Sequence, residues 1–156
     1  GYSYDGADAS FELLANKLLG KLPEYLKVKN YNVNVKKDED LKTTADVTFI
    51  IDGEEIHCSG EGNGPVNALD NAIRSNFKKV EKYYKYFADL KLLDYKVRIL
   101  NTGTEAVTRV SIESTDSKGK NWFTIGVSTN IIEASFKALI DSLDYKLFKD
   151  NAPASK

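Results

Sequence analysis

Hydrophobic and polar residues alternate in six short stretches of the chain, and these stretches fall into two groups of three. Alternation with a period of two is typical of β-strands that bury one face. The pattern predicts strands at residues 31–37, 45–51 and 55–59, and again at 95–100, 108–114 and 121–127. Asp52 and Gly53 indicate a tight hairpin turn within the first group, and residues 117–120 indicate its counterpart in the second.

Helical spacing of apolar residues precedes the first group of strands and follows each group. A first helix is predicted by the spacing between Phe11 and Leu19, with Asp8 or Ser10 as its N-cap. The other two helices are amphipathic. Their apolar faces consist of Leu69, Ala72, Ile73, Phe77 and Val80 after Pro65, and of Ile132, Phe136, Leu139, Ile140, Leu143 and Leu147 near the end.

This order of elements predicts an α+β fold with two tandem βββα units related by pseudo-twofold symmetry. Each antiparallel sheet is expected to carry its helix on one face, and one further helix precedes both units. We expect a connecting helical segment at residues 1–29 and a domain at 30–150, built from units 30–90 and 91–150. Residues 151–156 have no apolar anchor and are predicted to be a disordered tail.

The strands contain more apolar surface than one helix per sheet is expected to cover. A symmetric homodimer is therefore predicted, in which the open sheet faces of two copies stack. The residues expected to contribute are Val33, Val35, Val47, Phe49, Val97, Ile99, Val110 and Ile112.

Composition narrows the class of partners. The chain has 156 residues, with 22 Lys and Arg against 23 Asp and Glu, so no strong field attracts nucleic acid or an anionic membrane. It shows neither a run of membrane-spanning length nor the start of a signal peptide, and a cytoplasmic location is expected. A single cysteine is compatible with a reducing compartment. The first residue is not Met, which favours an excised fragment.

Catalytic chemistry is hard to assemble from these residues. His57 is the only histidine, so a metal site of two histidines and a carboxylate cannot form in one chain. His57 and Cys58 are adjacent in a predicted strand, so their side chains point to opposite faces and cannot act together as base and nucleophile. No catalytic residue, metal site or cofactor is predicted for this chain.

The glycine-rich stretch at residues 60–65 does not fit a nucleotide site, because it lacks both the G-x-G-x-x-G spacing and a P-loop lysine. Gly64 and Pro65 nevertheless place a helix N-terminus where backbone N–H groups can hold a small anion, such as an amino-acid carboxylate. Asn130 and Glu133 resemble a capping box at the last helix. Two ordinary, well-capped helices remain the alternative.

Double-stranded RNA binding is a second alternative, because the first half has the αβββα order of that domain class. Proteins of the class grip phosphates with lysines at the start of the last helix. This chain has Pro65, Val66, Asn67 and Asp70 there, so the cations that drive RNA binding are missing.

Three segments carry a resemblance to a known family: GEGNGPVNA at 60–68, DYKVRIL at 94–100 and GVSTNIIEAS at 126–135. They resemble the C-terminal regulatory domain of the α-isopropylmalate synthase, citramalate synthase and homocitrate synthase family. The similarity runs from Tyr4 to Leu147. The form of the last helix is closer to the citramalate branch than to the leucine-regulated branch.

The resemblance implies an allosteric, dimerising domain that binds a branched-chain amino acid. It implies feedback inhibition by isoleucine in the citramalate branch, with a leucine-binding domain of 2-isopropylmalate synthase as one alternative and a purely structural dimerisation module as another. It also implies that an absent catalytic barrel, using a divalent metal, condenses acetyl-CoA with pyruvate. This chain is therefore not expected to be an enzyme alone.

The resemblance also assigns an effector pocket. Asp5 is expected to accept from the effector's ammonium group, and the loop-to-helix junction is expected to bind its carboxylate. At the second helix N-terminus, Ser128, Thr129 and Asn130 replace Asn63 and its glycines, which departs from the first loop. The assigned residues are Tyr4, Asp5, Leu22, Tyr25, Gly62, Asn63, Gly64, Pro65 and Asn67, and the second helix N-terminus contributes Ser128, Thr129 and Asn130.

Overall fold

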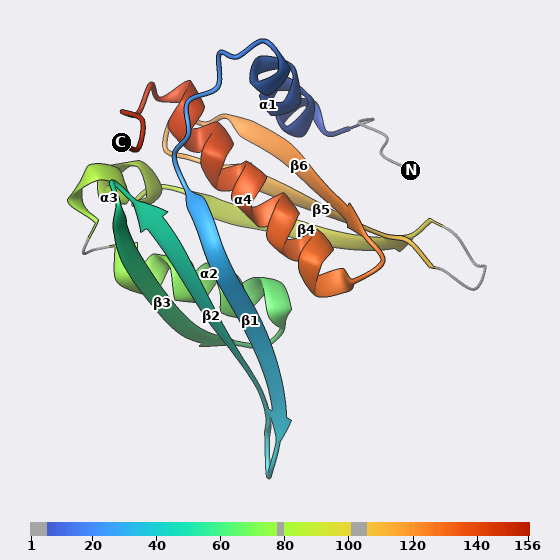
Figure 1. The fold of residues 1–156 in the computed structure, drawn as a ribbon. Helices are drawn as coiled ribbons and strands as arrows, with labels where there is room; N and C mark the ends of the chain where they lie inside the picture. The colour runs from blue at the N-terminus through green and yellow to red at the C-terminus, as the bar shows by residue number, and fades with distance from the viewer. Residues whose placement is uncertain (1–5, 78–79, 101–105) are drawn as a thin grey trace. The chain divides into compact units, whose positions relative to one another are not determined.

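The computed structural model describes residues 6–77, 80–100 and 106–156. It confirms the α+β class, with an N-terminal helix and two three-stranded antiparallel sheets that are each followed by a helix (Figure 1). The chain divides into two compact units. The β1–β3 unit comprises Pro23–Phe87 and Ala152–Lys156, and the β4–β6 unit comprises Gly1–Leu22 and Ala88–Asn151.

The β1–β3 unit is a meander with helices after it. Its strands are β1 (Lys27–Lys37), β2 (Leu41–Ile51) and β3 (Glu54–Gly62), in the order β1-β2-β3. Asp52 and Gly53 both have positive φ, at 52° and 79°, which confirms the tight hairpin between β2 and β3. Helix α2 (Pro65–Phe77) packs on β3 and β2, and α3 (Glu81–Phe87) follows it.

The helix predicted after Pro65 is divided in the structure. Val80 lies between α2 and α3, and its carbonyl accepts the backbone N–H groups of Tyr83 and Tyr84. Tyr83 is fully buried and Phe87 is 5% exposed, so α3 contributes to the core of its own unit. The predicted apolar face ended at Val80, so the periodicity did not predict α3 as an element of its own.

The β4–β6 unit repeats the arrangement. Its sheet has the order β4 (Lys91–Ile99), β5 (Thr108–Thr115), β6 (Asn121–Ser128), and α4 (Ile131–Lys149) covers one face. Helix α1 (Asp8–Leu18) packs against α4 and β6.

The predicted N-caps of the first helix are wrong. The N-cap is Ala7, which makes no side-chain capping bond. Ser10 is buried inside α1; its hydroxyl donates to Oδ2 of Asp141 at 2.8 Å and accepts from the backbone N–H of Ile125 at 2.9 Å. Ser10 therefore ties α1 to α4 and β6 instead of starting the helix.

The apolar strand residues lie on the helix-covered faces. Val47, Phe49, Val110 and Ile112 are at most 1% exposed. Register places Val97 beside Val110 on the same face, although Val97 itself remains 41% exposed at the sheet edge. The opposite face is polar along β4 and β5, so the residues named above do not supply the open apolar face that the predicted stacking assumed.

The C-terminal residues 151–156 differ from the disordered tail that the composition suggested. The hydroxyl of Tyr83 donates to the carbonyl of Pro153 at 2.9 Å, and the backbone N–H of Asp52 donates to Oγ of Ser155 at 2.9 Å. Each of these bonds joins a side chain to a backbone group, and composition does not reveal such a pairing. The last residues are therefore fixed to the β1–β3 unit.

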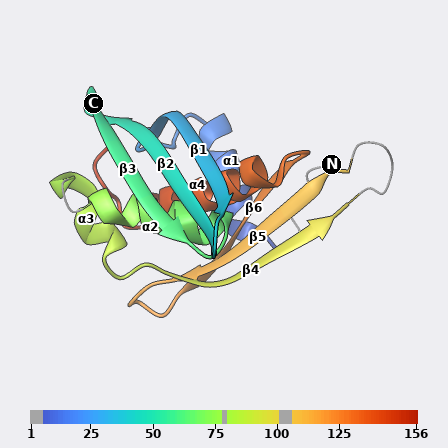
Figure 2. The same ribbon diagram turned by 90° about the horizontal axis from the view of Figure 1, so that it is seen from below.

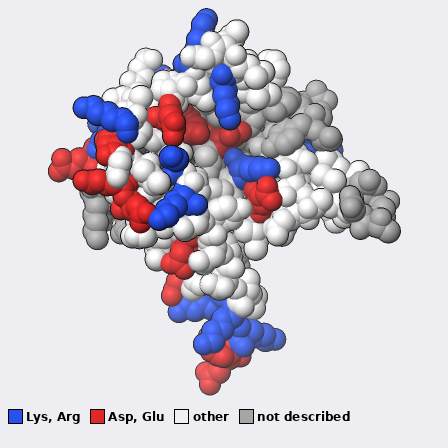
Figure 3. Space-filling view, viewed as in Figure 1, with Lys and Arg blue, Asp and Glu red and all other residues white. Residues whose placement is uncertain are grey.

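The surface carries both signs of charge. On the face drawn in Figure 3, basic and acidic residues lie interspersed, including at the tip of the hairpin between β1 and β2. Within the described ranges, no helix combines the length and the apolar composition needed to cross a membrane.

Candidate functional site

The junction between β3 and α2 is built on two close backbone contacts. A Cβ on Gly60 would lie 2.4 Å from the backbone nitrogen of Ala72, and one on Gly62 would lie 2.5 Å from that of Ala68. Real Cβ atoms do not approach so closely, so both positions require glycine. The last part of β3 therefore runs directly against the first turns of α2.

Asparagine side chains hold the loop between them. Oδ1 of Asn67 accepts the backbone N–H of Asn63 at 3.1 Å, and Nδ2 of Asn71 donates to the carbonyl of Glu61 at 2.7 Å. The carbonyl of Gly64 accepts the first intrahelical bond, from Ala68 at 2.9 Å. The loop thus has a defined shape in the described structure.

The start of α2 suits an anion. Pro65 occupies the first helical position, where its missing N–H costs nothing. The first turn of α2 contains no acidic residue, so no carboxylate of its own offsets the positive end of the helix dipole. N–H groups of a first turn have no intrahelical acceptor, so a ligand carboxylate is a suitable partner for them.

The start of α4 is satisfied by its own side chains. Oδ1 of Asn130 accepts from the backbone N–H groups of Ile132 and Glu133, at 2.8 and 3.3 Å. Glu133 does not close the predicted capping box; Oγ of Ser128 instead accepts the N–H of Asn130 at 3.1 Å and donates to Glu133. Hydrogen bonds from Lys137, which has the larger effect, and from Ser128 hold the pKa of Glu133 below its ordinary value.

The structure gathers five of the nine residues assigned to the first pocket: Gly62, Asn63, Gly64, Pro65 and Asn67 form the β3–α2 junction.

The assignment of the other four to this pocket stays a prediction. Tyr4 and Asp5 lie outside the described residues. Leu22 is half-buried and belongs to the β4–β6 unit. Tyr25 is 3% exposed and packs edge-on against Tyr83, with ring centroids 6.2 Å apart. Tyr25 is thus a core residue of its unit.

Sequence reasoning missed Asn71, which anchors the loop at Glu61. Its signal was present as the spacing of four residues from Asn67, which places both amides on one helix face.

The His57–Cys58 pair behaves as the strand pattern predicts. Cys58 is 1% exposed, and burial raises the pKa of its thiol to about 11, so the thiolate is not formed at neutral pH. His57 is exposed on the other face, with Nδ1 at 3.0 Å from Oγ1 of Thr48. Among the described residues, no group of three or more His, Cys, Asp or Glu side chains is arranged to hold a metal ion.

Comparison with known proteins identifies relatives along most of the chain. It is 47% identical over 154 residues to (R)-citramalate synthase of Geobacter sulfurreducens, covering 96% of this chain and 28% of the relative. It is also 47% identical to (R)-citramalate synthase of Aquifex aeolicus, covering 96% of this chain and 29% of that relative. Identity to 2-isopropylmalate synthase of Clostridium acetobutylicum is 34%, covering 85% of this chain and 22% of the relative.

The chain thus spans less than a third of the length of these relatives. Residues 5–147 match the model of the LeuA allosteric (dimerisation) domain, which covers both βββα repeats and α1. The chain therefore belongs to the LeuA allosteric (dimerisation) domain family.

Proposed function

We propose that this chain is the effector-binding and dimerising part of a citramalate synthase, and that its effector is isoleucine. The observation that carries the proposal is the 47% identity to (R)-citramalate synthases over 96% of the chain, against 34% to a 2-isopropylmalate synthase. A leucine-binding domain is the second candidate, because isoleucine and leucine differ by one methyl position and such pockets discriminate by only about 1–3 kcal/mol.

Condensation of acetyl-CoA with pyruvate is proposed for the parent protein, in a part outside this chain. A divalent metal bound by that part would supply its Lewis acid. The single histidine supports this division, because His57 lies exposed on a strand and its neighbour Cys58 is buried and protonated. The isolated chain is expected to show no turnover of acetyl-CoA and pyruvate with any divalent metal.

The isoleucine carboxylate is proposed to bind at the first turn of α2. The support is the dipole of a helix without an acidic first turn, together with the two glycines that bring the end of β3 against the first turns of α2. Asp5 remains the residue that the family resemblance assigns to the ammonium group. An ion-paired hydrogen bond of this kind contributes about 1.5–3 kcal/mol, so Asp5→Ala is expected to weaken binding roughly tenfold to a hundredfold.

Calorimetric titration with isoleucine, leucine and valine tests the proposal. The sharpest variant is Asn67→Asp, which keeps an oxygen for the N–H of Asn63 but adds a negative charge to the first turn. It should weaken isoleucine binding by at least tenfold while preserving the helix. The matched control is Asn130→Asp at α4, where the cap is already formed, and its affinity should match that of the parent chain.

The outcomes separate the alternatives. If Asn67→Asp binds isoleucine as tightly as the parent, the carboxylate does not lie at α2. A lack of heat with all three amino acids would leave the structural dimerisation module. In the full-length enzyme, Asp5→Ala should relieve feedback inhibition without lowering uninhibited turnover, because the effector acts through its different affinities for two states.

A homodimer is the proposed assembly, in keeping with the dimerisation domain family. Sedimentation over a range of micromolar concentrations should show a mass that rises toward twice 17.4 kDa. A constant monomer mass would contradict it.

A further inference from the structure

Strand β4 is an edge strand whose outer backbone groups face away from its sheet. The sheet order is β4-β5-β6, so β5 is the one sheet neighbour of β4 within the described residues. The N–H of Leu100 donates to the carbonyl of Val107 at 2.8 Å, so the backbone N–H and C=O groups of Leu100 face the β5 side. By alternation, Asp94, Lys96 and Arg98 also turn their backbone groups inward, and Tyr95, Val97 and Ile99 turn theirs outward.

The N–H of Tyr95 supports this assignment. It donates to the side-chain Oδ1 of its neighbour Asp94 at 2.8 Å rather than to β5. The outward-facing backbone groups of Tyr95, Val97 and Ile99 can thus pair with a further strand, once the N–H of Tyr95 gives up its bond to Asp94.

The two faces of β4 differ in chemistry, and both are exposed. Tyr95, Val97 and Ile99 lie on the helix side and are 39%, 41% and 63% exposed. Asp94, Lys96 and Arg98 lie exposed on the opposite face. An exposed edge with apolar residues is a template for pairing with another chain, and β4 carries no proline to prevent it.

We propose that β4 pairs antiparallel with β4 of a second copy, across a twofold axis through Lys96. This inference rests on the homodimer proposed above and names its surface. Asp94 then faces the partner's Arg98, and the reverse pair repeats it by symmetry. On the other face Tyr95 lies beside the partner's Val97, so the two sheets form one continuous sheet with an apolar side and a charged side.

The alternating orientation of the β4 backbone groups allows the twofold axis to pass through residue 95, 96 or 97. The contacts between side chains decide among these three registers. An axis at Val97 places Lys96 opposite the partner's Arg98, which is repulsive. An axis at Tyr95 carries the ladder into the β-bulge between Leu92 and Asp94. An axis at Lys96 keeps five pairs inside the regular segment 94–98.

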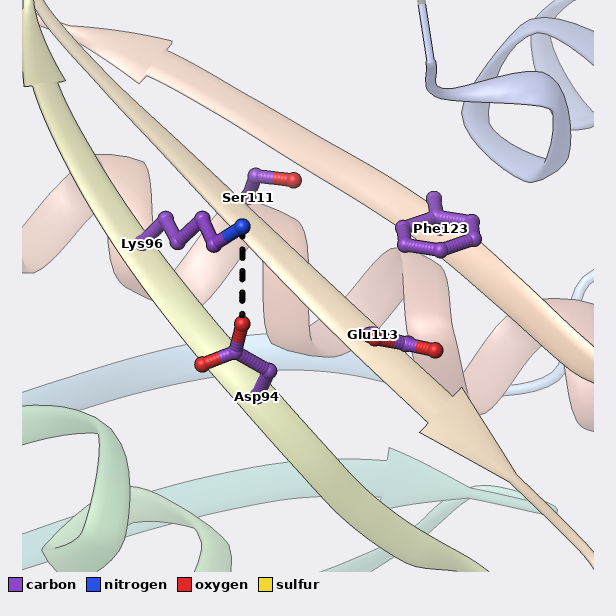
Figure 4. A pocket seen from close by; sticks show the side chains of 5 residues that line it. All are labelled: Asp94, Lys96, Ser111, Glu113 and Phe123. Atoms are coloured by element: carbon purple, nitrogen blue, oxygen red, sulfur yellow. Dashed lines mark ion pairs between the residues drawn. The ribbon is translucent and has the colours of Figure 1, made fainter.

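The remaining unfavourable contact is Lys96 against its own copy. Each Lys96 Nζ lies 3.7 Å from Oδ2 of its own Asp94, which offsets part of the repulsion (Figure 4). The repulsion that remains between the two Lys96 side chains predicts that removing this charge strengthens the pairing.

The charged face also offers a seat for the incoming arginine. A shallow depression lies on the side of the sheet away from α4 (Figure 4) and is lined by Asp94, Lys96, Ser111, Glu113 and Phe123. Register places Glu113 of β5 directly beside Asp94. The partner's Arg98 would thus meet the carboxylate of Asp94, with that of Glu113 one strand further in, and a planar guanidinium suits such a pair of carboxylates. Figure 2 shows β4 as the outer strand of its sheet.

Disulfide scanning in the full chain tests the register. Single cysteines at Tyr95, Lys96 and Val97 each report one axis, because a residue on the axis faces its own copy at a spacing of about 4.5–5.5 Å, which suits a disulfide. Lys96→Cys should form a covalent dimer under mild oxidation, and the other two variants should not. The parent chain controls for Cys58, which is buried.

Sedimentation of charge variants tests the pairs. Arg98→Asp should raise the dimer dissociation constant by on the order of tenfold, because two attractive pairs become repulsive. Adding Asp94→Arg to the same chain should restore the affinity, and Lys96→Thr should tighten the dimer. Lys36→Asp on β1, an edge strand of the other sheet, is the control and should leave the dissociation constant unchanged.

The outcomes are distinct. If the parent chain is a monomer, the proposed dimerisation itself fails. If it is a dimer but Lys96→Cys does not cross-link, or the swapped pair does not restore affinity, β4 is not the interface and the pairing is overturned while dimerisation stands. Cross-linking at Tyr95 or Val97 overturns the register.

Discussion

Replacing Asp144 by asparagine is expected to stabilise the protein at neutral pH. Oδ1 of Asp144 is buried in α4 without a hydrogen-bond partner among the described residues. Burial, reinforced by the neighbouring Asp141 carboxylate, raises the pKa of Asp144 from 3.8 to about 8, although Lys17 opposes the shift. Burial also raises the pKa of Asp141 to about 6, against the hydrogen bond that Ser10 donates to it.

The sign follows from proton binding. Between pH 4 and 8 the folded state holds a proton on Asp144 that the unfolded chain has released, so folding becomes less favourable as the pH rises. At pH 7 about three pH units separate the solution from the unfolded pKa, and each is worth about 1.4 kcal/mol, which gives a ceiling of about 4 kcal/mol. Relaxation around the pair lowers this, so Asp144→Asn is expected to add about 2–4 kcal/mol.

Urea unfolding at one fixed protein concentration, from pH 4 to pH 8, measures the effect. Fixing the concentration matters because dimerisation makes apparent stability concentration-dependent. The difference between Asp144→Asn and the parent should be small near pH 4 and grow toward pH 8. Asp38→Asn, whose side chain is 75% exposed, is the control and should stay within about 0.5 kcal/mol of the parent. The reasoning is refuted if Asp144→Asn is less stable than the parent at pH 7, or if the difference does not depend on pH.

Three further changes test other parts of the structure by the same unfolding assay. Lys146→Met leaves the buried carboxylates around a 2% exposed ammonium uncompensated and should cost about 3–5 kcal/mol at pH 7. That loss in stability should shrink below about pH 4. Burial opposes ionisation of Asp150, but the ammonium groups bonded to it hold its pKa below the ordinary value. The parent therefore loses the stabilisation from this ion pair as the pH falls through the folded-state pKa of Asp150. Gly126→Ala places a Cβ 1.9 Å from a helix carbonyl and should cost about 1–3 kcal/mol, whereas Gly64→Ala meets nothing within 4 Å and should cost far less. Asn130→Ala should cost about 1 kcal/mol through the lost cap, and an unchanged midpoint would contradict its role.

Local signals in the sequence predicted most of the fold. Alternation found all six strands, and Asp52-Gly53 identified a hairpin because positive φ at both positions suits few other residue pairs. Asn130 was also recognised correctly as a cap, since an N-cap bonds to residues two and three positions later. Each of these features is decided by neighbours along the chain.

Features that depend on distant residues were not accessible in this way. Serine is a residue type that N-cap positions favour, but Ser10 lies buried within α1 and donates to Asp141, which is 131 positions away in the sequence. The contacts of Pro153 and Ser155 each join a side chain to a backbone group far away in the sequence, and a backbone group has no sequence signature. In the candidate site, Gly62, Gly64 and Tyr25 were all assigned by the family resemblance. Close approach to α2 explains the glycine at 62 but not the one at 64, and the pocket role of Tyr25, which is buried in a core, stays a prediction.

The close contact between β3 and α2 has a mechanical consequence. With Gly60 against Ala72 and Gly62 against Ala68, no side chain separates strand from helix, so neither element slides past the other without a steric clash. From α2, Asn67 holds the loop at Asn63, and Asn71 holds the end of β3 at Glu61. A displacement of Asn63 is therefore transmitted to α2 and its sheet as the movement of one rigid body, with little local deformation.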